Sequence, residues 1–270
     1  MEQNQKKVIT TTTTTVVTEE VVESKKSVET HYLLIVDESG SMSTVHQATI
    51  NTVNEQIQTL KSLEKKFPDQ KYYISLIAFN TNAREVFMNI PASEAKEITS
   101  KDYEPNGGTA LLDAMGLGLT RLEDKVRPLM TDPNKIATAV VVVITDGEEN
   151  SSHEWKGDKI KILVERLNKD DKWTISYVGA NQDAIMASSK LGIYAGNSVN
   201  YNSTSRGVDS VNAALYTTMS MRASGISNGA YSFVGGGISN SSFLADYGGT
   251  IDENQELPKT DDQTNDQIIP

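Results

Sequence analysis

Apolar residues along the chain follow two patterns, continuous runs of strand length and repeats at helical spacing. The runs YLLIVD at residues 32–37 and AVVVVI at residues 139–144 contain no alternating polar positions, which predicts strands buried on both faces. Between them, apolar residues recur every three or four positions over residues 44–66, which predicts an amphipathic helix that ends before Pro68. This mixture of patterns favours alternating strands and helices.

The segments that follow continue this alternation. KYYISLIAFN and AREVFMNI are typical of two strands joined by a short polar turn, which predicts an antiparallel hairpin at the sheet edge. Further helices are expected at GGTALLDAMGLGLTRLEDKV (opening at Thr109), near residues 159–167, at NQDAIMASSKLG and near residues 208–221, with a strand at WTISYVG. The predicted class is α/β, a doubly wound, mostly parallel sheet with one antiparallel edge strand and helices on both faces.

Composition divides the chain into three parts. Residues 1–30 are rich in Thr, Val, Glu and Lys without an apolar face, which predicts an extended or disordered arm; the alternative is a strand added to a sheet edge, its own or a partner's. Residues 31–223 are expected to form the folded domain. Residues 224–270 begin rich in Gly and Ser and end acidic, and we expect a tail whose aromatic residues pack on the body: Tyr231, Phe233, Phe243 and Tyr247.

Charge and cysteine content exclude several classes of protein. The net charge of -11 argues against a nucleic-acid partner, because binding a phosphate backbone needs a basic surface. The absence of Cys excludes disulfides, thiolate metal sites and a cysteine nucleophile. No apolar run approaches the ~20 residues of a membrane-spanning helix. The first residues lack the apolar segment of a secretory signal, so we expect a cytoplasmic protein, with incorporation in a particle or assembly as the alternative.

Hydroxyl and carboxylate side chains gather where the two buried strands are predicted to end. In DESGS, Asp37, Ser39 and Ser41 alternate along the chain and can face one point if the loop curls. Thr109 opens a predicted helix after NGG, and Asp146 follows the second buried strand. In open α/β sheets, ligands bind outside the carboxyl ends of the strands. Because all these side chains offer hard oxygen donors, the pattern indicates a cation site.

The order of these residues resembles the metal-ion-dependent adhesion site of von Willebrand factor type A (vWA) domains, D-x-S-x-S followed by a Thr and an Asp. The same resemblance extends to the order of strands and helices over residues 31–223 and to the sequence segments around these residues, LLIVDESGSM, PNGGTALLDA and VVVVITDGEEN. It implies Mg²⁺ held, partly through water, by five residues: Asp37, Ser39, Ser41, Thr109 and Asp146. It also implies a partner protein whose Asp or Glu completes the coordination.

The chemistry of the five donors supports the same choice of ion independently of the resemblance. Neither His nor Cys is among them, so Zn²⁺ and Cu²⁺ are poorly matched, whereas Mg²⁺, or alternatively Mn²⁺ or Ca²⁺, suits hydroxyl and carboxylate oxygens. Three acids beside the site, Glu38, Glu148 and Glu149, are expected to repel an incoming carboxylate unless a basic partner surface satisfies them. Asp113 is expected to be an outer group of the site or a salt-bridge partner, and the acidic end of the chain is an alternative internal ligand.

Other kinds of site fit this sequence poorly. An EF-hand is excluded because the twelfth residue counted from Asp37 is Ala48, where a bidentate Glu is required. Neither serine of the motif has the flanking glycines of a hydrolase elbow, and NGGT lacks the Lys of a P-loop. A catalytic triad would need one of three histidines, each expected to be an ordinary surface or helix-end residue: His31, His46 and His153.

The sequence therefore predicts a cation-dependent protein-binding module, an adaptor or scaffold, rather than an enzyme. An accessory component of a larger particle or surface assembly, docked through the arm and tail, is the alternative. A metal-dependent hydrolase is a third option, but it would need a general base near the ion. Neither the partner's identity nor the oligomeric state follows from the sequence.

Overall fold

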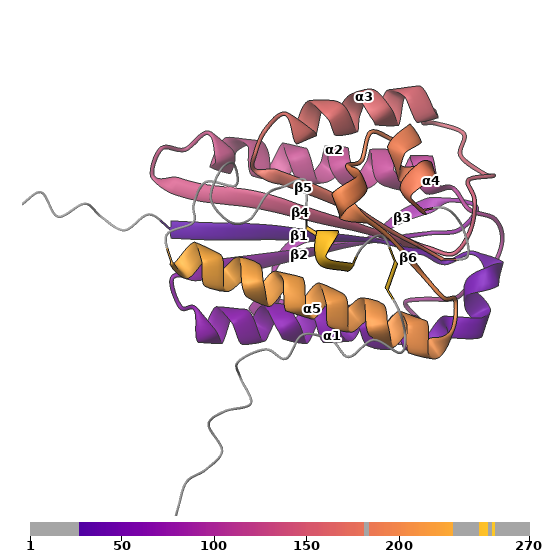
Figure 1. Cartoon of the computed structure of the whole chain (residues 1–270), viewed down its shortest axis with the longest axis horizontal. Helices are drawn as coiled ribbons and strands as arrows, with labels where there is room; N and C mark the ends of the chain where they lie inside the picture. The colour runs from indigo at the N-terminus through magenta and orange to yellow at the C-terminus, as the bar shows by residue number, and fades with distance from the viewer. Residues whose placement is uncertain (1–26, 181–183, 229–242, 248–249, 252–270) are drawn as a thin grey trace, which may run out of the picture.

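The computed structural model describes residues 27–180, 184–228, 243–247 and 250–251 (Figure 1). Within these ranges, six strands form one sheet in the order β3-β2-β1-β4-β5-β6. Their bounds are β1 (Ser27–Asp37), β2 (Gln70–Phe79), β3 (Ala83–Pro91), β4 (Lys135–Thr145), β5 (Trp173–Ala180) and β6 (Ser198–Tyr201). Every neighbouring pair is parallel except β2 with β3. The predicted α/β class and the antiparallel edge hairpin are confirmed.

Helices cover both faces of the sheet (Figure 1). The helices α1 (His46–Lys66) and α5 (Ser205–Ser227) lie on one face, and α2 (Leu111–Met130), α3 (Gly157–Asn168) and α4 (Ala184–Lys190) lie on the other. Short 3₁₀ helices form η1 (Gly40–Val45), η2 (Ala92–Glu94), η3 (Ala195–Asn197) and η4 (Ala245–Tyr247).

The uninterrupted apolar runs of the central strands, residues 32–36 in β1 and 139–144 in β4, arise because each face of these strands packs against a separate core. In β1, Leu34 and Val36 contribute to the core beneath α1 and α5, whereas Leu33 and Ile35 contribute to the core beneath α2 and α3. Successive side chains of a strand point to opposite faces, so a strand between two helix layers needs apolar residues at every position.

The first strand begins at Ser27, before the expected domain boundary at residue 31. Residues 28–30 are buried and pair with β2 on one side and β4 on the other. The prediction was wrong here because Glu29, Thr30 and His31 are polar and do not extend the apolar run. His31, expected on the surface, is fully buried in this strand. Residues 1–26 of the predicted arm lie outside the described residues.

Smaller differences concern the ends of other elements. The predicted helix over residues 44–66 begins at His46, after η1, and the helix expected to open at Thr109 begins at Leu111. The strand β6 was not predicted, because a run of four residues is too short to show a periodic pattern.

Part of the predicted tail packs on the domain. The helix α5 continues to Ser227, beyond the expected boundary at residue 223. Phe243, Leu244 and Ile251 are buried, and Ile251 N donates a hydrogen bond to Asn200 O of β6 at 2.8 Å. Of the four aromatic residues expected to pack on the body, Phe243 and Tyr247 contact the core, while the other two lie outside the described residues. Among the described helices, none has the length and apolar character needed to cross a membrane.

Candidate metal centre

The fold brings the two predicted acidic positions to one edge of the sheet. The strands β1 and β4 are parallel neighbours, and Val36 pairs with Ile144, so the two strands end at the same level of the sheet. Asp37 ends β1, and Asp146 directly follows β4. From this point the chain turns to α1 on one face and to α3 on the other (Figure 1). Such a divergence at the carboxyl ends of strands is where α/β sheets bind ligands.

The loop after β1 curls as the alternating pattern of DESGS predicts. Ser39 N donates a hydrogen bond to Asp37 Oδ1 at 2.7 Å, which turns the loop back on itself. The Oγ atoms of Ser39 and Ser41 lie 3.1 Å apart, and Ser41 Oγ donates to Asp146 Oδ1 at 2.6 Å. Four of the five predicted ligands are therefore linked by direct hydrogen bonds.

Thr109 approaches the same point from the loop before α2. An ideal Cβ built on Gly147 would lie 3.3 Å from Thr109 Oγ1 and 3.9 Å from Asp37 Oδ2, so both oxygens border one small space beside Asp146. Thr109 N donates to Asn150 Oδ1 at 2.9 Å, which fixes the loop. The structure thus gathers the five predicted oxygen donors; their role as metal ligands stays a prediction.

Thr145 is a neighbour of the site that the sequence did not reveal. As the last residue of β4, it donates from Oγ1 to Asp37 Oδ2 at 2.5 Å. Its position directly before Asp146 was the available signal, but the contact joins residues on separate strands and depends on their pairing. This hydrogen bond helps to fix the orientation of the buried carboxylate.

The surroundings of Asp37 disfavour the charged form of its carboxyl group. The residue is 0% exposed, and burial raises the pKa of its carboxyl above the ordinary value. Hydrogen bonds from Thr145 and Ser39 act in the opposite direction, while the charge of Asp146 raises this pKa further. A nearby cation would favour the ionised form of both carboxylates.

Two of the three acids expected to repel a ligand are engaged elsewhere. Glu38 forms an ion pair with Arg84, whose Nη2 lies 2.8 Å from Oε1. Glu149 accepts a hydrogen bond from Leu112 N at 2.9 Å, in the first turn of α2, and further bonds from the following loop. Glu148 alone is exposed beside the site. The expected repulsion is therefore much reduced.

Asp113 has a different role from either of those expected. Its carboxylate accepts hydrogen bonds from three consecutive backbone amides at 2.7 to 3.0 Å, those of His153, Glu154 and Trp155. It therefore anchors the loop between β4 and α3, and within the described part of the chain no Lys, Arg or His pairs with it. His46 begins α1 and donates from Nε2 to Tyr103 O at 2.9 Å, and His153 is exposed, as expected.

The donor set fits a hard divalent cation. Two carboxylates and three hydroxyls supply only oxygen, which matches Mg²⁺ and disfavours metals that prefer nitrogen or sulfur. Throughout the described parts of the chain, no group of three or more His, Cys, Asp or Glu side chains is placed to hold a metal ion. A site here would depend on its hydroxyls. Ser41 is exposed and Asp146 partly exposed, so this side of the site faces solvent.

Residues 32–149 match the family model of the von Willebrand factor type A domain. The chain is a vWA domain protein. The match begins in β1 and ends just after Asp146, so it includes all five residues of the candidate metal centre. None of the curated proteins matches this sequence.

Several solved structures have a similar fold. A von Willebrand factor type A protein from Catenulispora acidiphila is 20% identical with a TM-score of 0.43, over 64% of this chain and 38% of that one. The ArnB paralog VWA2 from Sulfolobus acidocaldarius is 16% identical with a TM-score of 0.42, over 72% of this chain and 46% of that one. The PilB minor pilin from Streptococcus sanguinis is 11% identical with a TM-score of 0.46, over 73% and 62%. The vWA domain thus corresponds to less than half of the first two proteins.

Proposed function

We propose that this vWA domain binds a divalent cation, Mg²⁺ in the first instance, and uses it to bind the carboxylate of a partner protein. The ligands would be Asp37, Ser39, Ser41, Thr109 and Asp146. The observation that carries the proposal is the buried Asp37 carboxylate, whose close partners are hydroxyls, an amide and a second carboxylate. Buried charges in proteins are normally paired or coordinate metals.

The charges of the donor set explain why a bound ion would attract a partner. Three donors are neutral hydroxyls, so the two Asp charges only balance a divalent cation. Such an ion supplies an electrophilic position that takes a further anionic oxygen. Because vWA domains commonly serve as protein-interaction modules, an Asp or Glu side chain of a protein is the proposed source of that oxygen.

The surroundings of the site favour binding over hydrolysis. Metal-assisted hydrolysis needs a general base beside the ion. Glu38 and Glu149 are occupied by Arg84 and by backbone amides, and Glu148 lies exposed at the rim. We propose that Glu148 pairs with a basic residue of the partner, which would orient the incoming acidic side chain.

Thermal unfolding with and without metal tests the first half of the proposal. The Tm of the full chain should rise in millimolar Mg²⁺ or Mn²⁺ relative to EDTA, and Asp37→Ala combined with Ser39→Ala should abolish this rise. Asp124→Asn, an exposed position on α2, is the matched control and should respond to metal like the wild type. An unchanged Tm of the wild-type protein at millimolar metal would contradict the proposal.

A pull-down tests the second half. The full chain, immobilised in Mg²⁺, should retain a protein from native extract that EDTA releases and that Asp146→Asn fails to capture. Substituting the acidic residue of the captured protein that contacts the ion should also abolish binding. A partner retained equally in Mg²⁺ and EDTA would show that binding does not use the metal.

A further inference from the structure

The edge strand β3 contributes a charged residue to the loop that carries the candidate metal ligands. We propose that Arg84 is a positioning residue for this metal loop (residues 37–41), acting through Glu38. The inference rests on the proposed function, because it assumes that the loop binds a cation. Arg84 lies on a different element from all five proposed ligands, and nothing in its local sequence connects it to them.

The Arg84 and Glu38 side chains form a close, bidentate contact. Arg84 Nη2 donates to Glu38 Oε1 at 2.8 Å and to Oε2 at 3.0 Å, and Nε donates to Oε2 at 3.3 Å. The Glu38 side chain is 3% exposed, so this carboxylate depends on its partners within the protein. Glu104 N donates to the same carboxylate at 2.5 Å.

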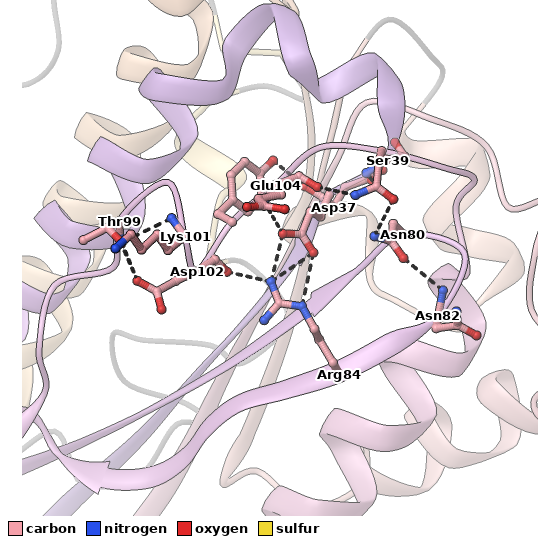
Figure 2. Close-up of polar contacts among 12 residues, drawn as sticks. Asp37, Ser39, Asn80, Asn82, Arg84, Thr99, Lys101, Asp102 and Glu104 are labelled. Carbon is pink, nitrogen blue, oxygen red and sulfur yellow. Dashed lines mark hydrogen bonds and ion pairs between the residues drawn. The ribbon is translucent and has the colours of Figure 1, made fainter.

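Arg84 also holds the segment that supports the metal loop from outside. Its Nη2 donates to Asp102 O at 2.6 Å, and Figure 2 shows its side chain reaching from β3 toward Asp102 and Glu104. Asp102 is itself fixed by Thr99, whose N and Oγ1 each donate to Oδ2 at 2.8 Å. One guanidinium therefore connects the segment 99–104, the metal loop and the sheet edge.

Backbone hydrogen bonds pass this restraint to the ligands. Asn106 N donates to Glu38 O at 2.9 Å, and Gly40 N donates to Gly107 O at 3.2 Å. These bonds lie on either side of Ser39, which is one of the proposed ligands. The regular pairing of β1 with β2 ends at Asp37, and one further backbone bond joins Glu38 N to Phe79 O at 2.6 Å. The bonds to residues 106 and 107 therefore add a restraint on the backbone directly around Ser39.

Loss of Arg84 would therefore disturb ligand geometry in addition to stability. A buried carboxylate without its cation must move toward solvent or draw the backbone with it. Ligand groups have to be held within roughly 0.5 Å of the productive geometry. Substitution of a group that orients metal ligands typically lowers metal affinity about 10-fold to 100-fold. We expect Arg84 to act in this range.

The test combines Mn²⁺ titration calorimetry with amide hydrogen exchange of the full chain in EDTA. Arg84→Gln should weaken Mn²⁺ binding at least about tenfold. Without metal, it should accelerate exchange at the amides of Gly40 and Asn106. Arg84→Lys should restore part of the affinity, because it keeps the charge but loses the two-pronged geometry. Arg121→Gln, an exposed position on α2, should change neither measurement.

A second pair of variants separates positioning from charge. Glu38→Gln combined with Arg84→Gln should weaken binding about as much as either single variant, because both residues act through one contact. If only charge mattered, Arg84→Gln would bind Mn²⁺ more tightly, since it leaves an unpaired carboxylate near the ion; that result would overturn the inference.

The remaining outcomes are equally distinct. Faster exchange with unchanged Mn²⁺ affinity would reduce Arg84 to a structural residue, and unchanged exchange would remove the proposed restraint altogether. If the wild-type protein binds no Mn²⁺ while Arg84→Gln still accelerates exchange, the proposed function fails and the positioning role fails with it.

Discussion

The two ends of β1 both bury ionisable side chains, but they handle charge differently. At the amino end, Glu29 Oε1 lies 2.7 Å from Lys135 Nζ at the start of β4. His31 donates from Nδ1 to Asn89 Oδ1 at 2.7 Å and stacks on Tyr73. The acid at this end has a cation supplied by the protein itself, as expected of a structural cluster.

At the carboxyl end, the chain supplies Asp37 with hydroxyls and an amide but sets a second carboxylate, Asp146, nearby. Among the described residues, the buried acid at the amino end has a cationic partner, whereas hydroxyls, an amide and another acid surround the one at the carboxyl end. A buried carboxyl whose pKa is raised beside a like charge is a candidate for function rather than stability. This difference is why the polar cluster at the carboxyl end of β1, and not the buried cluster at its amino end, is the candidate site.

The largest expected effect is at the carboxyl end, where Asp146→Asn should stabilise the protein in EDTA but make it less stable than the wild type in Mg²⁺. In EDTA, Asp146→Asn should raise the unfolding free energy by about 0.5 to 1 kcal/mol, because it removes a like charge beside Asp37. With Mg²⁺ at about 100 times its Kd, the wild-type protein should gain about 2.7 kcal/mol and the variant none. Urea unfolding in both buffers measures the two values; a variant less stable than wild type in EDTA would contradict the comparison.

At the amino end, the effect should be nearly as large but independent of metal. Lys135→Met removes the cation of the buried Glu29 carboxylate and should cost about 2 kcal/mol of unfolding free energy, equally in Mg²⁺ and EDTA. Lys159→Met, an exposed lysine on α3, is the control and should change stability by less than about 0.5 kcal/mol. A cost that depended on metal would show that the two ends of β1 are coupled.

The pH dependence of stability should carry the signature of His31. Burial lowers the pKa of its imidazole below the ordinary 6.5, with Asn89 and Glu29 opposing this shift, so the unfolded chain binds the proton more readily. Stability is then fully present above pH 6.5 and is lost as the pH falls toward the lower folded pKa, by at most about 1.4 kcal/mol per pH unit. Unfolding in urea between pH 7.5 and 5 measures this slope.

His31→Gln should flatten that slope without changing the response to metal. The raised pKa of Asp37 has the opposite sign: it favours the folded state at low pH, and this contribution is lost as the pH rises through the folded pKa. Measurements in EDTA above pH 5 keep the two contributions apart only if the His31→Gln variant is subtracted. An identical slope in the variant would assign the effect to other groups.

The smallest expected effect is at Gly147. A Cβ there would lie 3.3 Å from Thr109 Oγ1, a distance at which the threonine must give way slightly. Gly147→Ala should therefore weaken Mn²⁺ binding a few-fold while changing the unfolding free energy in EDTA by less than about 0.5 kcal/mol. Gly157→Ala, where a Cβ would meet nothing within 4 Å, is the control. Equal affinities would mean that the space beside Gly147 is not the ion's position.

Features with a local signature were predictable from the sequence. The uninterrupted apolar runs identified β1 and β4, and the three-and-four spacing identified α1, because side-chain periodicity follows directly from backbone geometry. Asp37 and Asp146 were placed together for a similar reason, since the carboxyl ends of adjacent parallel strands meet at one edge of the sheet. The set of five candidate ligands followed from the resemblance to vWA domains. Boundaries were less accurate where polar residues are buried, as at His31.

Contacts between distant residues were not predictable. Their positions in the sequence predicted that Glu38 and Glu149 would repel a ligand. In the structure, Arg84 pairs with Glu38, and backbone amides that include one in the first turn of α2 bind Glu149. The same applies to Asp113, which anchors the loop over residues 153–155. No periodic pattern relates these partners, because their pairing depends on how the loops pack after the sheet has formed.

The sequence by itself determined the class of fold, the edge of the sheet at which ligands gather and the hard-oxygen chemistry offered there, since all three follow from residue type and backbone periodicity. Only the tertiary structure decided which of the described acids near the candidate site have a cationic or amide partner, as Glu38 and Glu149 do. Whether an acidic side chain has such a partner depends on side-chain distances of a few ångströms. Those distances are set by the packing of loops that lie far apart in the chain.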